Sequence, residues 1–272
     1  MIMGTLVMGV VNVTPDSFSD GGRWFTTGAA VAHGLDLLEQ GADILDVGGE
    51  STRPGAERPT TEEELHRVVP VIRELSLAGA RVSVDTMRAS VAAQAVEAGA
   101  SIVNDVSGGL ADPEMARVVA QAGVPFVVMH WRGHSDTMQA RASYDDVVAE
   151  VCRALSQRVS DLRTQGVRPE QLILDPGFGF AKLPEHNWSL LAHLDALQAL
   201  GFRVLVGTSR KTFLGALGVS ERHPPRPPDE RDVGTAATTV IASLAGVWGV
   251  RVHDVASSID ALRVVAAMEA AR

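Results

Sequence analysis

The chain has 272 residues and a formal net charge of −9, with 46% hydrophobic and 21% charged residues, as in an ordinary soluble globular protein. This length allows one large domain or two smaller ones, and it buries a large core without disulfide or metal cross-links. The single cysteine, Cys152, excludes an intramolecular disulfide framework and any site built from several cysteines. The acidic balance argues against broad nucleic-acid binding, which needs a basic face.

No apolar run reaches the length of about 18 residues that a transmembrane helix needs, so we expect no membrane association. The segment Met1–Gly9 lacks the basic region and the cleavage site of a signal peptide. We therefore expect a cytoplasmic protein.

Short runs rich in Val and Ile alternate along the chain with longer amphipathic stretches. Several of these runs are apolar on both faces, which is typical of a buried parallel sheet. The eight predicted strands, in chain order, are Leu6–Val11, Asp43–Val47, Arg81–Asp85, Ser101–Asp105, Pro125–Met129, Gln171–Asp175, Arg203–Gly207 and Val250–His253.

The stretches between these strands carry helix signals. A capping box at Thr61–Glu64 precedes an apolar stripe, Ser143 and Asp146 open a second stripe, and Ser257 precedes the last helix. Glycines that end a helix before the next strand are predicted at Gly41, Gly79, Gly99, Gly123, Gly166 and Gly201.

Eight strands that alternate with helices predict an α/β fold, a (β/α)8 TIM barrel in a single domain over residues 1–272. The main rival is a doubly wound open sheet, which needs a Gly-rich phosphate loop after the first strand. The segment Asn12–Asp16 has no such fingerprint. The Pro-rich stretch Glu221–Glu230 is expected to be a surface loop.

A polar or ionisable side chain follows every predicted strand. In chain order these are Asn12, Asp46 with Glu50, Asp85, Asn104 with Asp105, His130, Asp175, Ser209 with Arg210 and Lys211, and Arg251 with His253. Any single Asp or Asn is more often a helix cap or a turn residue. Because all eight strands end in this way, and active sites of such barrels lie at the carboxyl ends of the strands, we predict a ligand site there.

The signs of these charges are sorted along the sequence. Acids and amides follow strands two, three, four and six, whereas the cations Arg210, Lys211, Arg251 and His253 follow strands seven and eight. Carboxylates accept hydrogen bonds from ring N–H and amino groups, and cations hold phosphate oxygens. The pattern favours a ligand with a hydrogen-bonding heterocycle at one end and an anion at the other.

Half of the twelve aromatic residues fall in the loops of the predicted active face, namely Phe18, Trp24, Phe25, Trp131, Phe178 and Phe180. The loops Asn12–Trp24 and Gly48–Pro59 are long and rich in Gly, Pro, Ser and Thr, which favours a functional role. Arg53 in the second loop is a candidate for a further anion contact.

Three other motifs are weak. The segment Gly207–Arg210 lacks the second glycine of a nucleophile elbow, so a hydrolase triad is disfavoured. His130 and His134 are four residues apart but not on a predicted helix, which disfavours a zinc pair. Cys152 lies within a helical pattern and is expected to be inert.

Two long motifs resemble signatures of the dihydropteroate synthase family: MGVVNVTPDSFSDGG (Met8–Gly22) and DVGGESTRPG (Asp46–Gly55). Shorter motifs complete the pattern: VDT (Val84–Thr86), NDVSGG (Asn104–Gly109), MH (Met129–His130), LDPGFGF (Leu174–Phe180), SRK (Ser209–Lys211) and RVH (Arg251–His253). The resemblance extends from Leu6 to the last helix, and it implies a (β/α)8 fold, most often dimeric.

The resemblance implies an enzyme that joins p-aminobenzoate to hydroxymethyl-dihydropterin pyrophosphate, with Mg²⁺ as cofactor, and yields dihydropteroate and pyrophosphate. It assigns pterin binding to Asp85, Asn104, Met129, Asp175, Gly207 and Lys211. It assigns the pyrophosphate to Asn12, Arg251 and His253, with Asn12 also at the metal. It assigns p-aminobenzoate to Phe18, Thr52, Arg53, Pro54, Ser209 and Lys211. The catalytic residues it implies are Asp85, Lys211, Arg251 and His253.

The expected mechanism is loss of pyrophosphate to leave a pterin cation, which the neutral amine then attacks without a dedicated general base. Asp16 and Asp20 are weaker candidates for positioning the metal or the cation. Two alternatives stay open: a barrel that transfers a methyl group from methyltetrahydrofolate to a corrinoid protein, and a non-catalytic pterin-binding paralogue. The first has no use for the cations after strands seven and eight, and the intact basic end argues against the second.

Overall fold

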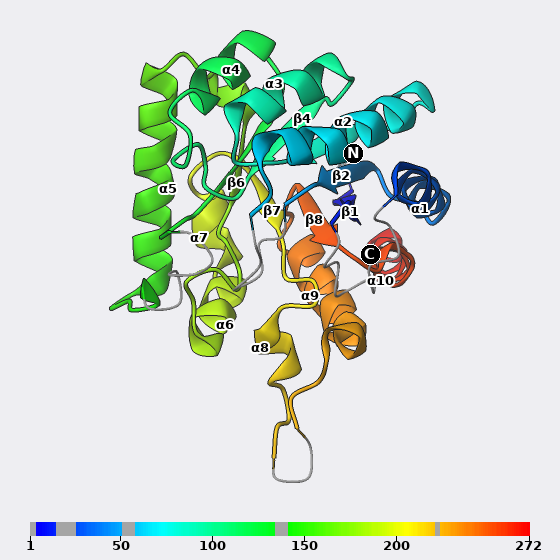
Figure 1. Cartoon of the computed structure of the whole chain (residues 1–272). Coiled ribbons are helices and arrows are strands. Elements are labelled where there is room, and N and C mark those ends of the chain that lie inside the picture. Colours follow the sequence, from blue (N-terminus) through cyan, green and yellow to red (C-terminus); the bar gives the residue numbers. More distant parts are fainter. Residues whose placement is uncertain (1–3, 15–25, 51–57, 134–140, 221–223) are drawn as a thin grey trace.

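A computed structural model describes residues 4–14, 26–50, 58–133, 141–220 and 224–272 of the chain. Eight parallel strands close into a barrel in the order of the sequence, and helices surround it (Figure 1). The strands are β1 Leu6–Asn12, β2 Ile44–Gly48, β3 Val82–Asp85, β4 Ile102–Asp105, β5 Phe126–Met129, β6 Leu172–Asp175, β7 Arg203–Val206 and β8 Gly249–Val252. All eight predicted strands and the (β/α)8 fold are confirmed. No strand bound differs from its predicted position by more than one residue.

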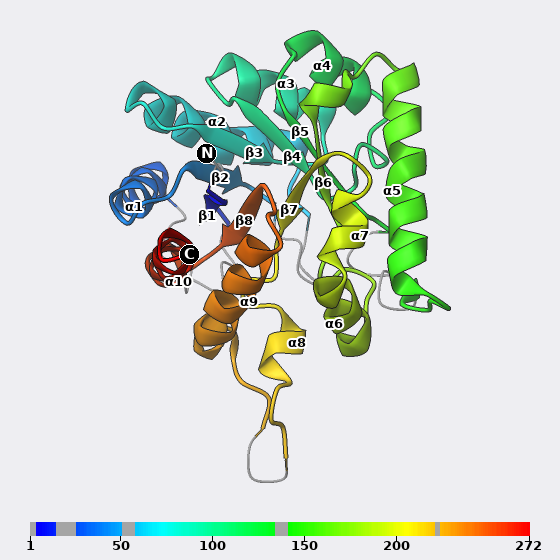
Figure 2. The same cartoon turned by 180° about the vertical axis from the view of Figure 1, so that it is seen from behind.

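The helices follow the strands around the barrel, so that neighbours in sequence are also neighbours in space (Figures 1 and 2). They are α1 Thr27–Glu39, α2 Thr61–Leu77, α3 Ala89–Glu97, α4 Met115–Ala122, α5 Val147–Thr164, α6 Pro184–Ala192, α7 Leu194–Gln198, α8 Thr212–Gly215, α9 Asp232–Leu244 and α10 Val255–Ala270. Short 3-10 turns lie at Pro169–Gln171 and Pro228–Arg231.

Two helix starts differ from the prediction. The capping box of α2 is formed by Thr60 and Glu63, one residue earlier than expected, because Glu64 is buried and its carboxylate accepts a hydrogen bond from Thr86 at 2.5 Å. Helix α10 begins after the cap Asp254, whose carboxylate accepts the N–H of Ser257. The predicted Ser257 start is therefore three residues late. The Asp146 cap of α5 is confirmed.

The predicted glycines before the strands are confirmed as turn positions. Each has a positive φ, a conformation that side chains with a Cβ disfavour. They are Gly41, Gly79, Gly99, Gly123, Gly166 and Gly201.

The barrel interior is filled in layers. Six buried apolar side chains form a separate cluster inside the barrel, one layer below the residues at the carboxyl ends of the strands: Met8, Ile44, Ile102, Val127, Ile173 and Leu205. Side chains alternate between the two faces of a strand, so the residue two positions further along also points into the barrel. The second core, between strands and helices, is larger and almost wholly apolar. Because side chains alternate in this way, the strand-end residues that lie two positions after these six can contact one another inside the barrel.

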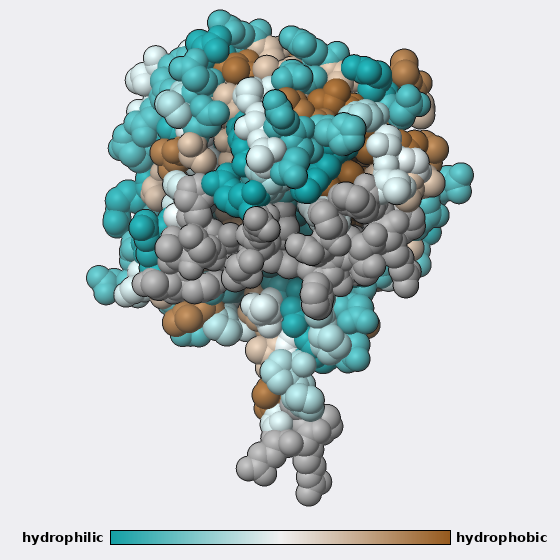
Figure 3. Space-filling model, viewed as in Figure 1, coloured by the Kyte–Doolittle hydropathy of each residue, from teal (hydrophilic) through white to brown (hydrophobic). Residues whose placement is uncertain are grey.

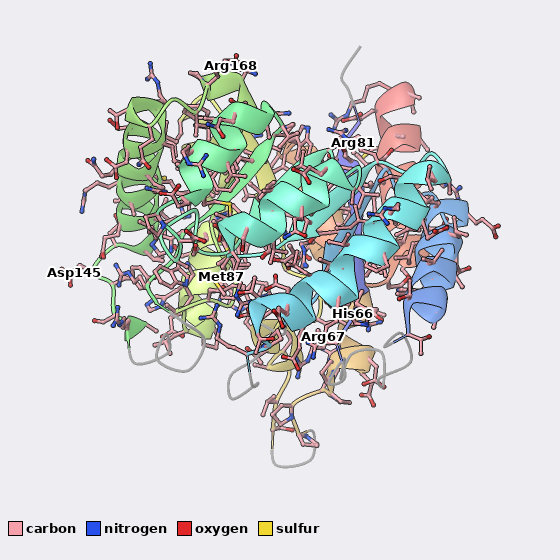
Figure 4. All side chains as sticks on the ribbon, turned by 45° about the horizontal axis from the view of Figure 1, so that its top comes forward. His66, Arg67, Arg81, Met87, Asp145 and Arg168 are labelled. Carbon is pink, nitrogen blue, oxygen red and sulfur yellow. The ribbon has the colours of Figure 1, made fainter. Side chains whose placement is uncertain are left out.

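The two ends of the barrel are distinguishable in Figure 4. Arg81 and Arg168, which precede β3 and β6, lie at one end, whereas Met87, which follows β3, lies toward the other with Arg67 of α2. The described residues between α8 and α9, 216–220 and 224–231, project from the body (Figures 1 and 2). In its described part, residues 224–230 are mostly exposed, which confirms the predicted surface loop there.

Hydrophilic side chains predominate on the surface seen in Figure 3, and the apolar ones form separate small patches. None of the helices in the described part of the chain is long and apolar enough to cross a membrane.

Candidate active site

The strand-end residues point into the barrel because they lie two positions after an interior apolar residue. Asp46 follows Ile44, Asn104 follows Ile102, and Asp175 follows Ile173 in this way. Register strengthens the grouping, because Asp85 is paired with Asn104 and Met129 with Asp175 on adjacent strands. Polar side chains from four strands therefore share the inner face just above the apolar layer.

Arg251 of β8 lies at the centre of this layer. Its Nε donates to Asp46 Oδ2 at 2.6 Å, and its Nη2 donates to Asp85 Oδ2 at 2.8 Å. Asn104 Nδ2 donates to the same Asp46 oxygen at 2.9 Å. One guanidinium thus joins β8 to β2 and β3 across the mouth, and we call Asp46, Asp85, Asn104 and Arg251 the central cluster.

The central cluster corrects one expectation. The sequence favoured acids on one side of the mouth and cations on the other, but Arg251 contacts two of the acids directly. The closed barrel causes this, because β8 is hydrogen-bonded to β1 and so lies close to β2. Strands that are distant in sequence are therefore near neighbours in the fold.

Burial controls the protonation of the central cluster. Desolvation raises the pKa of Asp85 to about 7, against the opposing pull of Arg251 and with a further rise from Asp46. Desolvation alone would lower the pKa of Arg251, but the carboxylates of Asp46 and Asp85 outweigh it and raise this pKa. The guanidinium therefore stays charged, while Asp85 gains or loses its proton near neutral pH.

The β6 side of the mouth holds a second group. Asp175 Oδ1 accepts the backbone N–H of Gly177 at 2.7 Å, and burial raises the pKa of this carboxyl. Lys211 Nζ lies 4.0 Å from the centre of the Phe180 ring, a cation–π contact. Burial and the neighbouring Arg251 lower the pKa of Lys211 to about 8, although Asp175 and Asp85 oppose this.

Two glycines leave room in this second group. A Cβ on Gly207 would lie 3.7 Å from Asp175 Oδ2, so this backbone passes directly beside the carboxylate. A Cβ on Gly179, whose φ is +76°, would lie 2.8 Å from Lys211 Cδ. The lysine stem therefore needs a glycine at position 179 to lie against this loop.

Ser209 and His253 connect the loops after β7 and β8. Ser209 Oγ and His253 Nδ1 lie 2.9 Å apart, and the backbone N–H of His253 donates to the same hydroxyl at 3.1 Å. Ser209 is buried. Asn12 ends β1 and is half-buried, in register with Gly48 of β2.

Several strand-end candidates do structural work instead. Arg210 has a φ of +57° and forms a two-pronged ion pair with Asp232, both N···O distances being 2.8 Å. Its guanidinium is therefore paired with an acid of α9, and its place in the anion-binding group stays a prediction. Asp105, one residue out of phase with Asn104, accepts hydrogen bonds from Ser107 and Gly109 in its own turn.

Glu50 and Phe178 are also structural. Glu50 pairs with Arg58 and Arg88, at 2.7 Å each, and Arg88 also pairs with the buried Glu64. Phe178 is buried and stacks with Phe213, so it packs beneath its loop. Both side chains therefore contact other parts of the protein: Glu50 through its ion pairs and Phe178 through its stacking with Phe213.

Some of the predicted residues lie outside the described part of the chain. These are Asp16, Phe18, Asp20, Trp24, Phe25, Thr52, Arg53, Pro54 and His134.

Cys152 is half-buried in α5, and burial raises the pKa of its thiol, which agrees with the expected inertness. Among the described residues, no three His, Cys, Asp or Glu side chains gather as a metal site.

Sequence reasoning did not assign a role to Asp46 or single out Lys182. Asp46 is fully buried and accepts two of the three hydrogen bonds of the central cluster. Its position two residues after Ile44 is the pattern that could have revealed it. Lys182, in the loop between β6 and α6, is also buried, and its Nζ contacts His130 Nδ1 at 3.1 Å.

The fold and the site define an enzyme of the (β/α)8-barrel class whose charged side chains converge at the carboxyl ends of the strands. Residues 8–253 match the pterin-binding enzyme family model, and the chain belongs to that family. Its relatives place it among the dihydropteroate synthases, which are transferases.

Two of these relatives, one of them solved in two complexes, show the extent of the likeness. Dihydropteroate synthase from Mycobacterium leprae is 54% identical over 262 residues, which are 96% of this chain and 92% of the relative. The Xanthomonas albilineans enzyme solved with 4-aminobenzoic acid has a TM-score of 0.90 and 46% identity, covering 99% of this chain and 94% of that one. The same enzyme with 7,8-dihydropteroate has a TM-score of 0.87 and 44% identity, with 99% and 95% covered.

Proposed function

We propose that the protein joins p-aminobenzoate to hydroxymethyl-dihydropterin pyrophosphate, giving dihydropteroate and pyrophosphate in folate biosynthesis. The observation that carries the proposal is the central cluster, in which buried carboxylates and a guanidinium meet at the barrel mouth. Such a cluster can bind a hydrogen-bond-donating ring and an anion side by side. Relatives solved with 4-aminobenzoic acid and with 7,8-dihydropteroate support both halves of this reaction.

The pterin ring is proposed to bind between the central cluster and Asp175. An ionised carboxylate has about four acceptor positions, so Asp85 keeps capacity for ring N–H groups beside its bond from Arg251. Asp46 Oδ1 is buried and has no hydrogen-bond partner among the described residues, which adds acceptor capacity below the ring. Asn104, Met129, Gly207 and Lys211 complete this pterin site.

The pyrophosphate is proposed to lie over Arg251, His253 and Asn12. The raised pKa of Arg251 keeps its charge at every working pH. His253 is positioned by Ser209, which fixes the direction in which the ring faces. Positive charge here stabilises the leaving oxygens as the C–O bond breaks.

The reaction is proposed to pass through a cation. The methylene C–O bond breaks with both electrons leaving on pyrophosphate, and the positive charge spreads into the dihydropterin ring. Asp85 and Asp175 stabilise that charge in a buried setting, where Coulomb attraction is stronger than in water. The neutral amine of p-aminobenzoate then forms the new C–N bond. Its proton is acidic once the bond has formed, so no dedicated general base is assigned.

The p-aminobenzoate pocket is proposed to be formed by Ser209 and Lys211 with Phe18, Thr52, Arg53 and Pro54. Support comes from the residues that flank the second loop, because Arg88 bonds both Glu50 and the Pro59 carbonyl, at 2.7 Å each. These bonds hold the two ends of the loop close to the barrel.

Mg²⁺ is proposed to bind at the end of β1. It is a hard cation that takes oxygen ligands, and the Asn12 amide would supply one of them beside the substrate phosphates and waters. When bound, it supplies positive charge that neutralises the leaving phosphate oxygens. The Asn12→Ala variant should therefore need more Mg²⁺ for half-maximal activity, measured in a magnesium titration.

The protein is also proposed to be a homodimer and to lie in the cytoplasm. Helix α9 carries three exposed apolar side chains on one face: Val233, Ile241 and Leu244, with exposed fractions of 79%, 46% and 51%. A second copy of the chain is the occupant that the family resemblance implies. Sedimentation should give a dimer for the wild type and a monomer for Ile241→Glu, and two identical masses would remove this support.

The experiment that tests the function is pyrophosphate release on mixing both substrates with Mg²⁺. The proposal predicts release that depends on both p-aminobenzoate and the pterin pyrophosphate. Binding of the pterin without release would favour a non-catalytic pterin-binding paralogue. Methyl transfer from methyltetrahydrofolate to a corrinoid, with no pyrophosphate release, would favour the methyltransferase alternative.

A further inference from the structure

The chain contains only two lysines, Lys182 and Lys211, among its 24 Lys and Arg residues. Lys211 belongs to the proposed pterin site, and Lys182 lies in the loop that connects β6 to α6 on the same side of the mouth. Lys182 is 4% exposed, and the proposed reaction gives it no role. A buried cation needs a partner for each of its hydrogens.

Lys182 Nζ has three partners. It donates to the carbonyls of Gly177 at 3.0 Å and Phe180 at 3.1 Å, and it lies 3.1 Å from His130 Nδ1. The three hydrogens of the ammonium are thus matched by three acceptors when His130 carries its proton on Nε2. Burial, with the charges of Lys182 and Arg132, lowers the pKa of His130 to about 2, so the ring is neutral.

The three contacts do not depend on the charge of Lys182. Burial lowers the pKa of Lys182 to about 7, against the raising effect of Asp175 and with further lowering by Arg132 and Lys211. As a neutral amine, Lys182 still donates to two carbonyls, and it accepts from His130 after the proton shifts to Nδ1. The amine therefore holds the loop on both sides of neutral pH.

Both loop carbonyls belong to peptides that reach the proposed pterin site. Gly177, held by its carbonyl, donates its own N–H to Asp175 Oδ1 at 2.7 Å. Phe180, held in the same way, places its ring 4.0 Å from Lys211 Nζ. His130 follows Met129, and its backbone N–H donates to the Asp175 carbonyl at 2.9 Å. The Lys182 amine thus contacts Gly177, Phe180 and His130 directly, and each of these residues contacts Asp175 or Lys211 of the proposed pterin site.

The backbone of this loop needs such a support. Gly177 and Gly179 have positive φ values of 70° and 76°, and Ala181 has a φ of 48°, which is strained for a residue with a Cβ. Tyr144 Oη donates to the Ala181 carbonyl at 3.0 Å, and Arg132 lies 3.8 Å from the centre of the Tyr144 ring. Lys182 occupies the inner side of this turn.

We propose that Lys182 is a positioning residue of the pterin site, which holds the 177–182 loop through two carbonyls and His130 and so places Asp175 and the Phe180 ring. The inference rests on the proposed function, because it concerns the same site. It assigns no contact between Lys182 and the substrate. Loss of the amine should therefore weaken pterin binding.

The test compares Lys182→Met with Gln171→Met. Gln171 is a matched control, because it is also buried, and its side-chain amide donates to the carbonyls of Val119 and Val124 at the opposite end of β6. Both variants should lower the thermal unfolding temperature. Only Lys182→Met should raise the KM for the pterin pyrophosphate, by about tenfold, the loss expected for one charge-assisted contact.

A spectroscopic readout separates positioning from general destabilisation. With ¹³Cε-labelled lysine, the wild type gives two side-chain signals and Lys182→Met gives only that of Lys211. This Lys211 signal should shift in the variant, because the Phe180 ring over it moves. An unchanged Lys211 signal with an unchanged pterin KM in folded Lys182→Met would overturn the inference.

A second pair of variants covers the case in which Lys182→Met does not fold. His130→Asn keeps an acceptor close to the position of Nδ1, whereas His130→Leu removes it. We expect a raised pterin KM for His130→Leu and a wild-type value for His130→Asn, and equal values for the two would overturn the inference. Absence of dihydropteroate formation by the wild type would instead refute the proposed function.

Discussion

Replacement of Asp85 by Asn removes the negative charge that this side chain carries when it is ionised, above a pKa of about 7, and keeps the size of the side chain. Asp85 accepts a 2.8 Å bond from Arg251, which also keeps its 2.6 Å bond to Asp46. Arg251 therefore retains a carboxylate partner in the variant. The fold should lose only about 1–3 kcal/mol, the range for one weakened bond to a charged group.

The effect on the proposed pterin site should be larger. The variant loses a charge-assisted hydrogen bond to the ring, worth about 1.5–3 kcal/mol, which corresponds to about 10- to 150-fold in affinity. It also loses attraction for the developing cation, about 4 kcal/mol for unit charges at about 4 Å in an effective dielectric of about 20. The rate should consequently fall more than the affinity.

The assay is calorimetric titration with the dihydropterin pyrophosphate, together with steady-state pyrophosphate release. Asp105→Asn is the matched control, since Asp105 is also a buried strand-end acid whose pKa burial raises, to about 6. Its carboxylate bonds Ser107 and Gly109 in its own turn, so that variant should lose stability but keep its pterin affinity. Wild-type affinity and rate in folded Asp85→Asn would refute the reasoning.

Three further predictions concern stability. Gly177→Ala should cost at least about 2 kcal/mol in urea denaturation, because its Cβ would lie 2.6 Å from the His130 carbonyl at a φ of +70°. Gly201→Ala, at a φ of +81° and with no atom of the described residues within 4 Å of its Cβ, should cost about 1 kcal/mol. Equal losses for the two variants would contradict a steric effect at Gly177. Arg210→Met should lose about 1–3 kcal/mol by leaving Asp232 without its two-pronged partner, and an unchanged urea midpoint would show that this ion pair does not stabilise the fold. Burial lowers the pKa of Lys182 from 10.5 to about 7, so between these pH values the unfolded chain binds more protons than the folded protein. The free energy of unfolding of the wild type, relative to that of Lys182→Met, should therefore rise from pH 7 toward pH 10. A difference that does not change with pH would argue against a buried amine among Asp175, His130, Arg132 and Lys211.

The sequence was enough to predict the barrel, because each strand is a short apolar run that ends in a polar residue and is followed by an amphipathic helix. Local chemistry also predicts the helix-ending glycines, which all have positive φ. The start of a helix is harder to predict from sequence when several possible capping residues are adjacent in the chain. At α2, burial of Glu64 decides that Thr60 and Glu63 form the cap.

The site was predictable in position but not in its pairings. The twofold alternation along a strand separates Asn104, which bonds Asp46, from Asp105, which bonds its own turn, although both follow the same apolar run. The contact of Arg251 with Asp46 and Asp85 depends on closure of the barrel between β8 and β1, which no local pattern encodes. Lys182 was missed because its partners are backbone carbonyls and His130, which leave no residue pattern.

The barrel mouth is proposed to stabilise charges that separate before the amine attacks. The measurement that tests this proposal most directly is the rate with a pterin pyrophosphate dideuterated at the reacting methylene, at limiting concentrations of substrate and compared with the protiated compound. The account predicts a slower reaction of the deuterated substrate, because the methylene carbon becomes trigonal as pyrophosphate leaves. Equal rates, with bond breaking shown to be rate-limiting, would contradict the cation and favour direct displacement by the amine.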